Sequence, residues 1–207
     1  MHSKGLLIVI TGPSAVGKGT IVRALLRQMQ DIRFSVSVTT RPPRPGEVDG
    51  VEYFFASHEE FDNLVVTDQL LEWAQVYDNR YGTPREQVEK ATAAGHDIIL
   101  DIDINGARQV REKFPEGVFV FVLPPSLGEL EARIRRRGTE DEAAIQRRLA
   151  AVPGWLQEGL TYEYVLVNDR LETAVEQLRA MIIAEKCRTD RQGGDLIRRL
   201  LEKGEID

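Results

Sequence analysis

Gly12-Pro-Ser-Ala-Val-Gly17-Lys18-Gly19-Thr20 follows the apolar run Leu6-Leu-Ile-Val-Ile10 near the start of this chain, with Thr11 between them. The order is that of a buried strand, a glycine loop and a helix. Gly12 and Gly17 allow positive φ, so several backbone N–H groups can point at one anion above the helix N-terminus. Lys18 adds a mobile positive charge for the outer phosphates of a nucleotide. The stretch therefore predicts a P-loop, whose binding residues run Gly12, Pro13, Ser14, Ala15, Val16, Gly17, Lys18, Gly19, Thr20.

The loop departs from the usual P-loop pattern at one position. Gly19 stands where Ser or Thr commonly follows the lysine, and Thr20 comes one residue later. A hydroxyl in this turn can reach Mg²⁺ or its water shell, so Thr20 is a candidate metal contact. The alternative is a glycine-rich turn that binds nothing, which leaves the lysine at position 18 unexplained.

Length, composition and charge limit the class of protein. The 207 residues suffice for one domain with insertions, and 42% hydrophobic with 29% charged residues is typical of a soluble globular chain. The N-terminal apolar run is too short for a signal peptide or a membrane span, and a single cysteine, Cys187, suits a reducing compartment, so we expect a cytoplasmic protein. A net charge of -6 argues against a nucleic-acid partner.

Periodicity and breaker residues predict alternating strands and helices. Strands are expected at 6–11, 34–40, 51–55, 70–77, 96–103, 118–123 and 164–167, with a turn at 79–82. Helices are expected after the P-loop and at 57–65, 84–95, 104–113, 127–137, 141–151 and 171–186, with Pro84 at the first helical position of its helix and Pro153-Gly-Trp155 interrupting the helix after 151. The pattern indicates an α/β fold with a parallel-sheet core.

Two segments interrupt this core. Residues 34–83 are rich in strand formers and contain a stiff loop with three prolines, so they predict a small β-rich lobe. Residues 125–152 predict a helical lid. The single domain therefore divides into a core (1–33, 84–124, 153–187), the lobe, the lid and a charged tail (188–207), which Gly193-Gly194 separates from the body. The tail could form a short helix that docks or mediates association.

An acidic strand end and an arginine cluster are the other chemical features. Asp101 and Asp103 end an apolar strand, and residues i and i+2 of a strand share a face. They are candidates for a metal or substrate contact, although Asp103 could instead cap the next helix. The lid holds six arginines that could close on phosphates, or could form a solvated face offset by nearby glutamates: Arg133, Arg135, Arg136, Arg137, Arg147, Arg148.

No histidine or cysteine is placed as a general base or nucleophile. His2, His58 and His96 lie at the terminus, in a predicted helix cap and at a strand start, and Cys187 has no base partner. An acceptor phosphate is already an anion, so its phosphorylation needs alignment, Mg²⁺ and positive charge rather than a base. A P-loop with many arginines and no base therefore predicts a nucleotide kinase.

The chain resembles the guanylate kinase family over about residues 5–187. The resemblance rests on the P-loop, on the specific run Ser35-Val-Ser-Val-Thr-Thr-Arg-Pro-Pro-Arg-Pro-Gly-Glu47, and on Glu72-Trp-Ala, Tyr81-Gly-Thr, Leu100-Asp-Ile-Asp and Arg137-Gly-Thr. It implies a P-loop NTPase-type core with an NMP-binding lobe and a lid, and transfer of the γ-phosphoryl of ATP to GMP with Mg²⁺. Ala15 departs from the glycine that this family often has there.

The resemblance also implies roles for single residues. Arg41, Arg44, Tyr53 and Tyr81 would hold the GMP phosphate, with Glu47 in the same loop. Ser37, Glu72 and Thr83 would read guanine, Asp101 and Asp103 would lie at the GMP and metal end with Asp101 a candidate metal contact, and Asn168 would flank adenine. The implied catalytic residues are Lys18, Arg41, Arg137 and Arg148.

Elementary hydrogen bonding agrees with the base-reading residues. Guanine presents two donors, N1–H and N2–H₂, that a carboxylate such as Glu72 can accept, while its O6 needs a donor such as the hydroxyl of Ser37 or Thr83. Adenine presents the opposite pattern, so the wrong base would leave buried polar groups unpaired. The alternative for Glu72 is a solvent-facing strand residue. The alternatives for the whole chain are a guanylate-kinase-like interaction domain, against which the intact P-loop argues, and a kinase for another small phosphate ester.

Overall fold

The computed structural model describes residues 4–76, 78–136 and 142–204. Its central feature is a five-stranded parallel sheet with strand order β2-β7-β1-β8-β9. The strands are β1 (Leu7–Thr11), β2 (Ile32–Phe34), β7 (Asp97–Asp101), β8 (Val118–Leu123) and β9 (Tyr164–Val167). Every residue of β1 is buried, as its unbroken apolar sequence predicts for a central parallel strand. The α/β prediction is confirmed.

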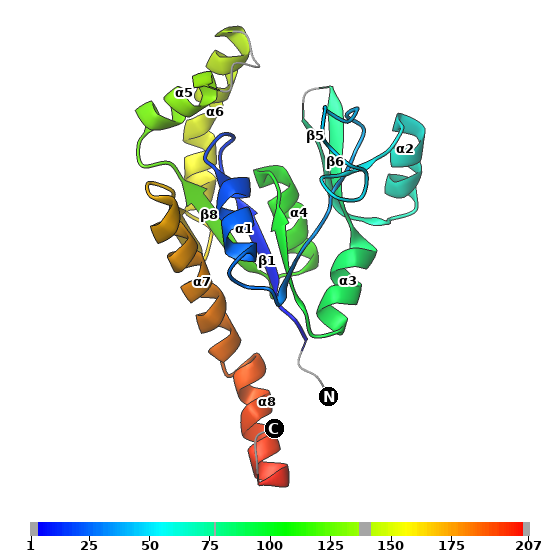
Figure 1. The fold of residues 1–207 in the computed structure, drawn as a ribbon, viewed down its shortest axis with the longest axis vertical. Coiled ribbons are helices and arrows are strands. Elements are labelled where there is room, and N and C mark those ends of the chain that lie inside the picture. Colours follow the sequence, from blue (N-terminus) through cyan, green and yellow to red (C-terminus); the bar gives the residue numbers. More distant parts are fainter. Residues whose placement is uncertain (1–3, 77, 137–141, 205–207) are drawn as a thin grey trace.

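Two pairs of helices cover the two faces of this sheet (Figure 1). They are α1 (Lys18–Leu26) with α7 (Leu171–Cys187), and α3 (Arg85–Ala93) with α4 (Ile104–Lys113). Ile8 and Ile10 belong to the apolar cluster that includes α1 and α7, while Leu7 and Val9 belong to the one that includes α3 and α4. Alternate residues of β1 thus pack into two cores, one on each face of the sheet. The strand is held firmly on both faces, and the P-loop follows it at the carboxyl edge of the sheet.

A second, four-stranded sheet forms the lobe, with order β4-β3-β6-β5. Its elements are β3 (Val38–Thr39), β4 (Phe54–Phe55), α2 (His58–Val66), β5 (Leu70–Val76) and β6 (Asn79–Pro84). β5 and β6 form an antiparallel hairpin, and α2 begins at the predicted capping box. A small core of Val38, Phe61 and Leu70 holds the lobe together.

The predicted strand at 34–40 is wrong as a single element. Phe34 ends β2 in the core sheet, and Val38 begins β3 in the lobe sheet. The last hydrogen bond of the core sheet runs from the Ser35 N–H to the Ile99 carbonyl, and the first of the lobe sheet from the Phe54 N–H to the Ser37 carbonyl. Alternating β-formers predict extended chain, but they do not reveal which sheet each residue joins.

The turn predicted at 79–82 is also wrong, because these residues belong to β6. Val76 pairs with Asn79, so the hairpin connection lies before the Asn-Arg-Tyr-Gly run that suggested a turn. Gly82 has a packing reason: a Cβ there would lie 2.8 Å from the Leu70 Cδ1 atom. Pro84 likewise precedes α3 as its N-cap residue rather than as the first helical residue.

Two helices, α5 (Leu127–Arg136) and α6 (Glu142–Gly159), contain most of the residues predicted as a lid, and a lid function stays a prediction (Figure 1). The interruption expected at Pro153-Gly-Trp155 is wrong, because α6 continues through it. Proline removes one N–H from the helical ladder, but Val152 and its apolar neighbours on α6 pack against Leu130 and Ile134 of α5. Tertiary packing therefore outweighs the local breaker.

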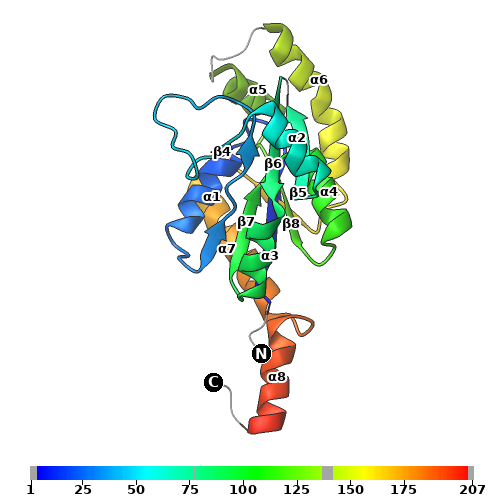
Figure 2. The same cartoon turned by 90° about the vertical axis from the view of Figure 1, so that its right-hand side faces the viewer.

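The tail contains a helix, α8 (Gln192–Lys203), which extends away from the body (Figure 2). Gly193 and Gly194, predicted to break the chain, lie inside its first turn, where close contacts with the Arg188 and Thr189 carbonyl oxygens leave no room for a Cβ. Its exposed apolar residues are Leu196, Ile197, Leu200 and Leu201. A role in association stays a prediction. Within the described ranges, none of the helices has the length and apolar character to cross a membrane.

Candidate active site

The P-loop turns from β1 into α1 through a backbone with three positive φ angles. Gly12 has φ 140° and Gly17 has φ 98°, as predicted for the two glycines. Ala15 also lies in the left-handed region, at φ 65°. An alanine there carries a strain of about 1 kcal/mol, which explains why glycine suits this position in the pattern that the sequence resembles. Left-handed positions of this kind suit a loop whose N–H groups turn toward one anion.

Two side chains hold the P-loop from outside. The Val16 carbonyl accepts a hydrogen bond from Asn168 Nδ2 at 2.7 Å and one from Arg133 Nη1 at 3.2 Å. Because the peptide is planar and trans, a Val16 carbonyl held outward directs the following Gly17 N–H inward. A Cβ on Gly17 would lie 2.3 Å from Asn168 Nδ2, so only glycine fits. Asn168, predicted to flank adenine, is buried here behind the loop.

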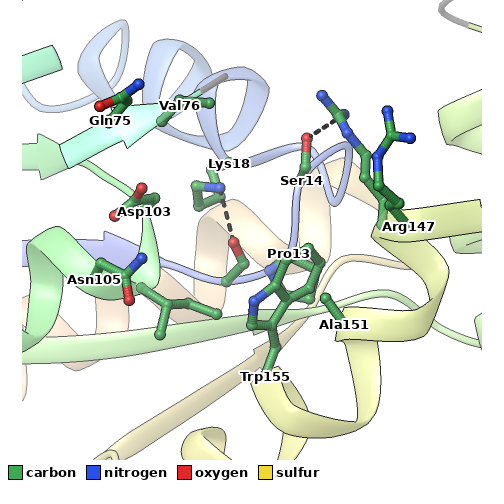
Figure 3. Close-up of a pocket in the computed structure, with 13 residues that line it drawn as sticks. Pro13, Ser14, Lys18, Gln75, Val76, Asp103, Asn105, Arg147, Ala151 and Trp155 are labelled. Atoms are coloured by element: carbon green, nitrogen blue, oxygen red, sulfur yellow. Dashed lines mark hydrogen bonds between the residues drawn. The ribbon is translucent and has the colours of Figure 1, made fainter. Parts of the chain in front are cut away.

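A cavity of about 440 Å³ opens beside the loop, between α4 and α6 (Figure 3). Lys18 Nζ donates to the Gly12 carbonyl at 3.1 Å within this cavity. From α6, Arg148 Nη1 donates to Ser14 Oγ at 2.8 Å, which places a lid arginine directly on the phosphate loop. Pro13 and Trp155 also line this cavity, with Trp155 at its lower edge in the view.

A second cavity of about 340 Å³ adjoins the first, and Lys18, Val76 and Asp103 line both. It lies between the core and the lobe. Its lining gathers most of the residues implied for GMP: Ser37, Arg41, Arg44, Glu47, Tyr53, Glu72, Tyr81, Asp101 and Asp103. Residues from position 18 to position 103 thus meet in one place, and the P-loop lysine is among the residues that border both cavities.

One end of the second cavity is built for an anion. Both carboxylate oxygens of Glu47 accept from Arg41 Nη2, at 2.8 and 2.9 Å, and the Arg41 guanidinium lies over the Tyr53 ring. The pKa of Glu47 is lowered by the Arg44 N–H and then by Arg41. Although burial lowers it, the pKa of Arg41 is raised on balance by Glu47. Glu47 therefore orients Arg41, while Arg44 and the hydroxyl of Tyr81 complete this polar end.

The other end holds a buried carboxylate. Glu72 is 4% exposed, and Thr83 Oγ1 donates to its Oε1 at 2.6 Å. Burial raises the pKa of Glu72 to about 7, although the Thr83 hydrogen bond acts the other way. Gly106 of α4 makes room for the carboxylate, since a Cβ there would lie 2.4 Å from Oε2. Because the Thr83 hydroxyl proton is directed at Glu72, Ser37 is the remaining hydroxyl of the predicted pair.

The acidic strand end divides into two roles. Asp103 is the N-cap of α4 and accepts from the Gly106 N–H at 2.7 Å, so the capping alternative is realised, while Asp103 also lines both cavities. Asp101 Oδ2 lies 3.1 Å from the place that a Cβ on Gly19 would occupy, so glycine at this position lets the carboxylate approach α1. Thr20 is exposed on the first turn of α1.

These oxygens suit the chemistry of Mg²⁺, which is bound in nucleotide enzymes by one or two carboxylates together with substrate phosphates. Asp101 beside the start of α1 fits that requirement. Over residues 4–76, 78–136 and 142–204, no three His, Cys, Asp or Glu side chains gather in a way that could hold a metal by themselves.

The lid arginines do not act as one group. Arg135 pairs with Glu131 and Glu142, and Arg136 pairs with Glu129, as the surface alternative predicted. Arg147 and Arg148 line the first cavity. Arg137, predicted to be catalytic, lies outside the described residues. Two residues of the site were not predicted from the sequence. Arg133, which holds the Val16 carbonyl, looks like its neighbouring arginines, and Gly106, which makes room for Glu72, is marked only as a glycine inside a predicted helix.

Comparison with known proteins agrees with this arrangement. The profile of the guanylate kinase family matches residues 4–185. The guanylate kinase of Symbiobacterium thermophilum is 63% identical over 98% of this chain and 96% of its own length, and that of Desulfitobacterium hafniense is 53% identical over 92% and 96%. A crystal structure of guanylate kinase from Anaplasma phagocytophilum superposes with a TM-score of 0.79 at 33% identity, covering 99% of this chain and 98% of that one. The chain belongs to the guanylate kinase family.

Proposed function

We propose that the two adjoining cavities divide the substrates of a guanylate kinase, with the ATP phosphates on the P-loop and GMP between the core and the lobe. The reaction is ATP + GMP ⇌ ADP + GDP. The observation that carries the proposal is that Lys18 and Asp103 line both cavities, so a phosphoryl group held by Lys18 lies next to the site of the acceptor.

Catalysis on this proposal is positioning and charge neutralisation. The acceptor phosphate is an anion and needs no base, whereas the transferring phosphoryl develops charge that fixed cations stabilise. Lys18 and the Gly17 N–H lie on the donor side, Arg41 and Arg44 on the acceptor side, and Arg148 reaches the loop from the lid. We assign Arg137 to the same role as Arg148.

Recognition of guanine is assigned to the buried end of the second cavity. Glu72 would accept N1–H and N2–H₂ of the base, with Thr83 orienting the carboxylate from behind. The Ser37 hydroxyl would donate to O6. AMP would face Glu72 with an acceptor nitrogen, which leaves a buried carboxylate without its partner.

Mg²⁺ enters on this proposal with ATP. The ion would lower the charge of the phosphates and orient them. Asp101 and Thr20 would contact it, directly or through water. Asp101 also borders the GMP cavity, so it lies between donor and acceptor. Asn168 is assigned to the adenine end of the ATP site.

The cellular setting follows from the substrates. Both are soluble nucleotides, and we place the reaction in purine nucleotide metabolism in the cytoplasm, without a nucleic-acid or membrane partner. The single cysteine and the net charge of -6 support this placement.

The test is a coupled assay of ADP formation with ATP and Mg²⁺, comparing GMP, AMP, CMP and UMP. Turnover confined to GMP, and reduced at least about 100-fold in Lys18→Met, is expected, because the lysine is a charge at the transferring phosphoryl. Lys90→Met, on the exposed face of α3, is the matched control and is expected to retain activity. A folded protein inactive with all four nucleotides would contradict the proposal.

A further inference from the structure

The chain crosses from the core sheet to the lobe sheet within three residues, Ser35 to Ser37. Ser35 still donates its N–H to the core strand β7, and the Ser37 carbonyl already accepts from the lobe. Val36 lies between them and belongs to neither sheet. A backbone peptide at such a crossing still needs hydrogen-bond partners when it is partly buried.

The side chain of Gln87 supplies these partners. Its Oε1 accepts from the Val36 N–H at 3.1 Å, and its Nε2 donates to the Val36 carbonyl at 3.4 Å. The Ser35 hydroxyl also donates to Oε1, at 3.3 Å. A primary amide has the same donor and acceptor as a peptide, so Gln87 takes the place of a neighbouring strand for one residue.

Gln87 lies in the first turn of α3, where the chain has just returned from the lobe to the core (Figure 1). The preceding strand β6 ends in Thr83 and Pro84, and Thr83 holds Glu72. One side chain therefore ties the segment that enters the lobe to the segment that leaves it. The first segment carries Ser37, which lines the GMP cavity, and the second carries Thr83, whose hydroxyl holds Glu72.

We propose that Gln87 is a positioning residue for guanine, which acts by fixing the Val36 peptide and thereby aiming the adjacent Ser37 hydroxyl into the GMP cavity. This inference rests on the guanine-reading role assigned to Ser37 under the proposed function. Gln87 does not line the cavity, and its effect on the base passes through the backbone. Nothing in the sequence distinguishes it from other polar residues on a helix surface.

The variant Gln87→Met keeps the length of the side chain and removes its three hydrogen bonds, the two to the Val36 peptide and the one to the Ser35 hydroxyl. We expect the KM for GMP to rise about 3- to 10-fold, the range that corresponds to one or two ordinary hydrogen bonds. The KM for ATP is expected to stay unchanged, because the P-loop is held by Asn168 and Arg133 instead. Gln87→Glu keeps the acceptor for the Val36 N–H, so its KM for GMP is expected to lie between those of the natural protein and Gln87→Met.

A double-mutant cycle separates positioning from general stabilisation. Gln87→Met is measured in the natural chain and in Ser37→Ala, with melting temperatures recorded for each protein. If Gln87 acts through Ser37, its loss costs less than about 2-fold in KM for GMP once the Ser37 hydroxyl is gone. Equal losses in both backgrounds, or a lower melting temperature with an unchanged KM, would overturn the inference.

The same cycle distinguishes this inference from the proposed function. If Ser37→Ala alone leaves GMP turnover unchanged, Gln87 has no hydroxyl to position and the inference fails, while GMP-specific turnover by the natural chain would still support the proposed reaction. Glu86→Gln, on the exposed side of the same turn, is the matched control and is expected to change neither constant.

Discussion

Burial favours the neutral form of the Glu72 carboxyl, whereas the guanine-reading role proposed for this residue needs the charged form. Burial raises its pKa to about 7, whereas two guanine donors require the ionised form. Binding of GMP at pH 7 is therefore expected to release roughly half a proton from this group. Titration calorimetry in buffers of different ionisation enthalpy measures the release. Glu72→Gln removes this contribution while leaving the titration of the GMP phosphate, so an identical release in both proteins would contradict the expectation.

The same shift predicts how stability depends on pH. Glu72 has a folded pKa near 7 and an unfolded value of 4.5, so the folded state binds more protons between these values and its stability falls as the pH rises through them. The loss reaches about 3 kcal/mol above pH 7. Glu72→Gln is expected to recover part of it at pH 8 and nothing at pH 4.5, measured by urea unfolding. A variant less stable than the natural protein at pH 8 would show that the charge is already compensated.

The residue scale also shows what the sequence could reveal about the site. Glu72 was predicted as a guanine-reading residue from the motif around it, and that role stays a proposal. Its burial and shifted pKa depend on Thr83 from the opposite strand and on Gly106 from α4, which lie 11 and 34 positions away. Partners of that kind are set by the fold, so no local pattern contains them.

At the scale of elements, helix α4 packs closely against the Glu72 carboxylate at Gly106. Gly106→Ala would normally favour a helix by about 1 kcal/mol. Here the new Cβ would lie 2.4 Å from Glu72 Oε2 and would displace the carboxylate to which we assign base reading. We expect kcat/KM for GMP to fall at least about 10-fold with the KM for ATP unchanged, as measured by steady-state kinetics.

Gly128 of α5 is the matched control for this glycine. A Cβ there meets only Ser126 Oγ, at 3.9 Å, so Gly128→Ala is expected to raise stability by about 0.5–1 kcal/mol and to leave turnover intact. If both alanines were equally active with GMP, the close approach of α4 to Glu72 would have no catalytic importance.

Elements were predicted well where one local rule decided them. The strands that became β1 and β8 were long apolar runs, and α2 began at its capping box. The errors arose where a distant partner decided. Residues 34–40 are shared between two different sheets, and Gln87 binds the peptide at the crossing. The helix α6 continues through Pro153 because it packs against α5. Local propensity is a weak prior in such places.

At the scale of the whole molecule, the site lies where the core, the lobe and the lid meet. The core sheet supplies the P-loop and Asp101, the lobe supplies Arg41 and Tyr81, and the lid supplies Arg148. Phosphoryl transfer in water risks hydrolysis of ATP, so a bound pair of substrates has to be enclosed before reaction. The parts that enclose it are joined to the core by short connections, of which Ser35–Ser37 is one.

We therefore expect the lobe and the lid to close on the core when both substrates bind. The two cavities share Lys18, so phosphates bound there would attract Arg41 of the lobe from one side and Arg148 of the lid from the other. Both attractions favour the same closed conformation. Small-angle scattering with GMP and a non-hydrolysable ATP analogue is expected to give a smaller radius of gyration than the free protein, with smaller changes for either ligand alone. Glu72→Gln with the same ligands is the control and is expected to stay open at GMP concentrations that close the natural protein. An unchanged radius with both sites saturated would mean that water is excluded without movement of the lobe or the lid.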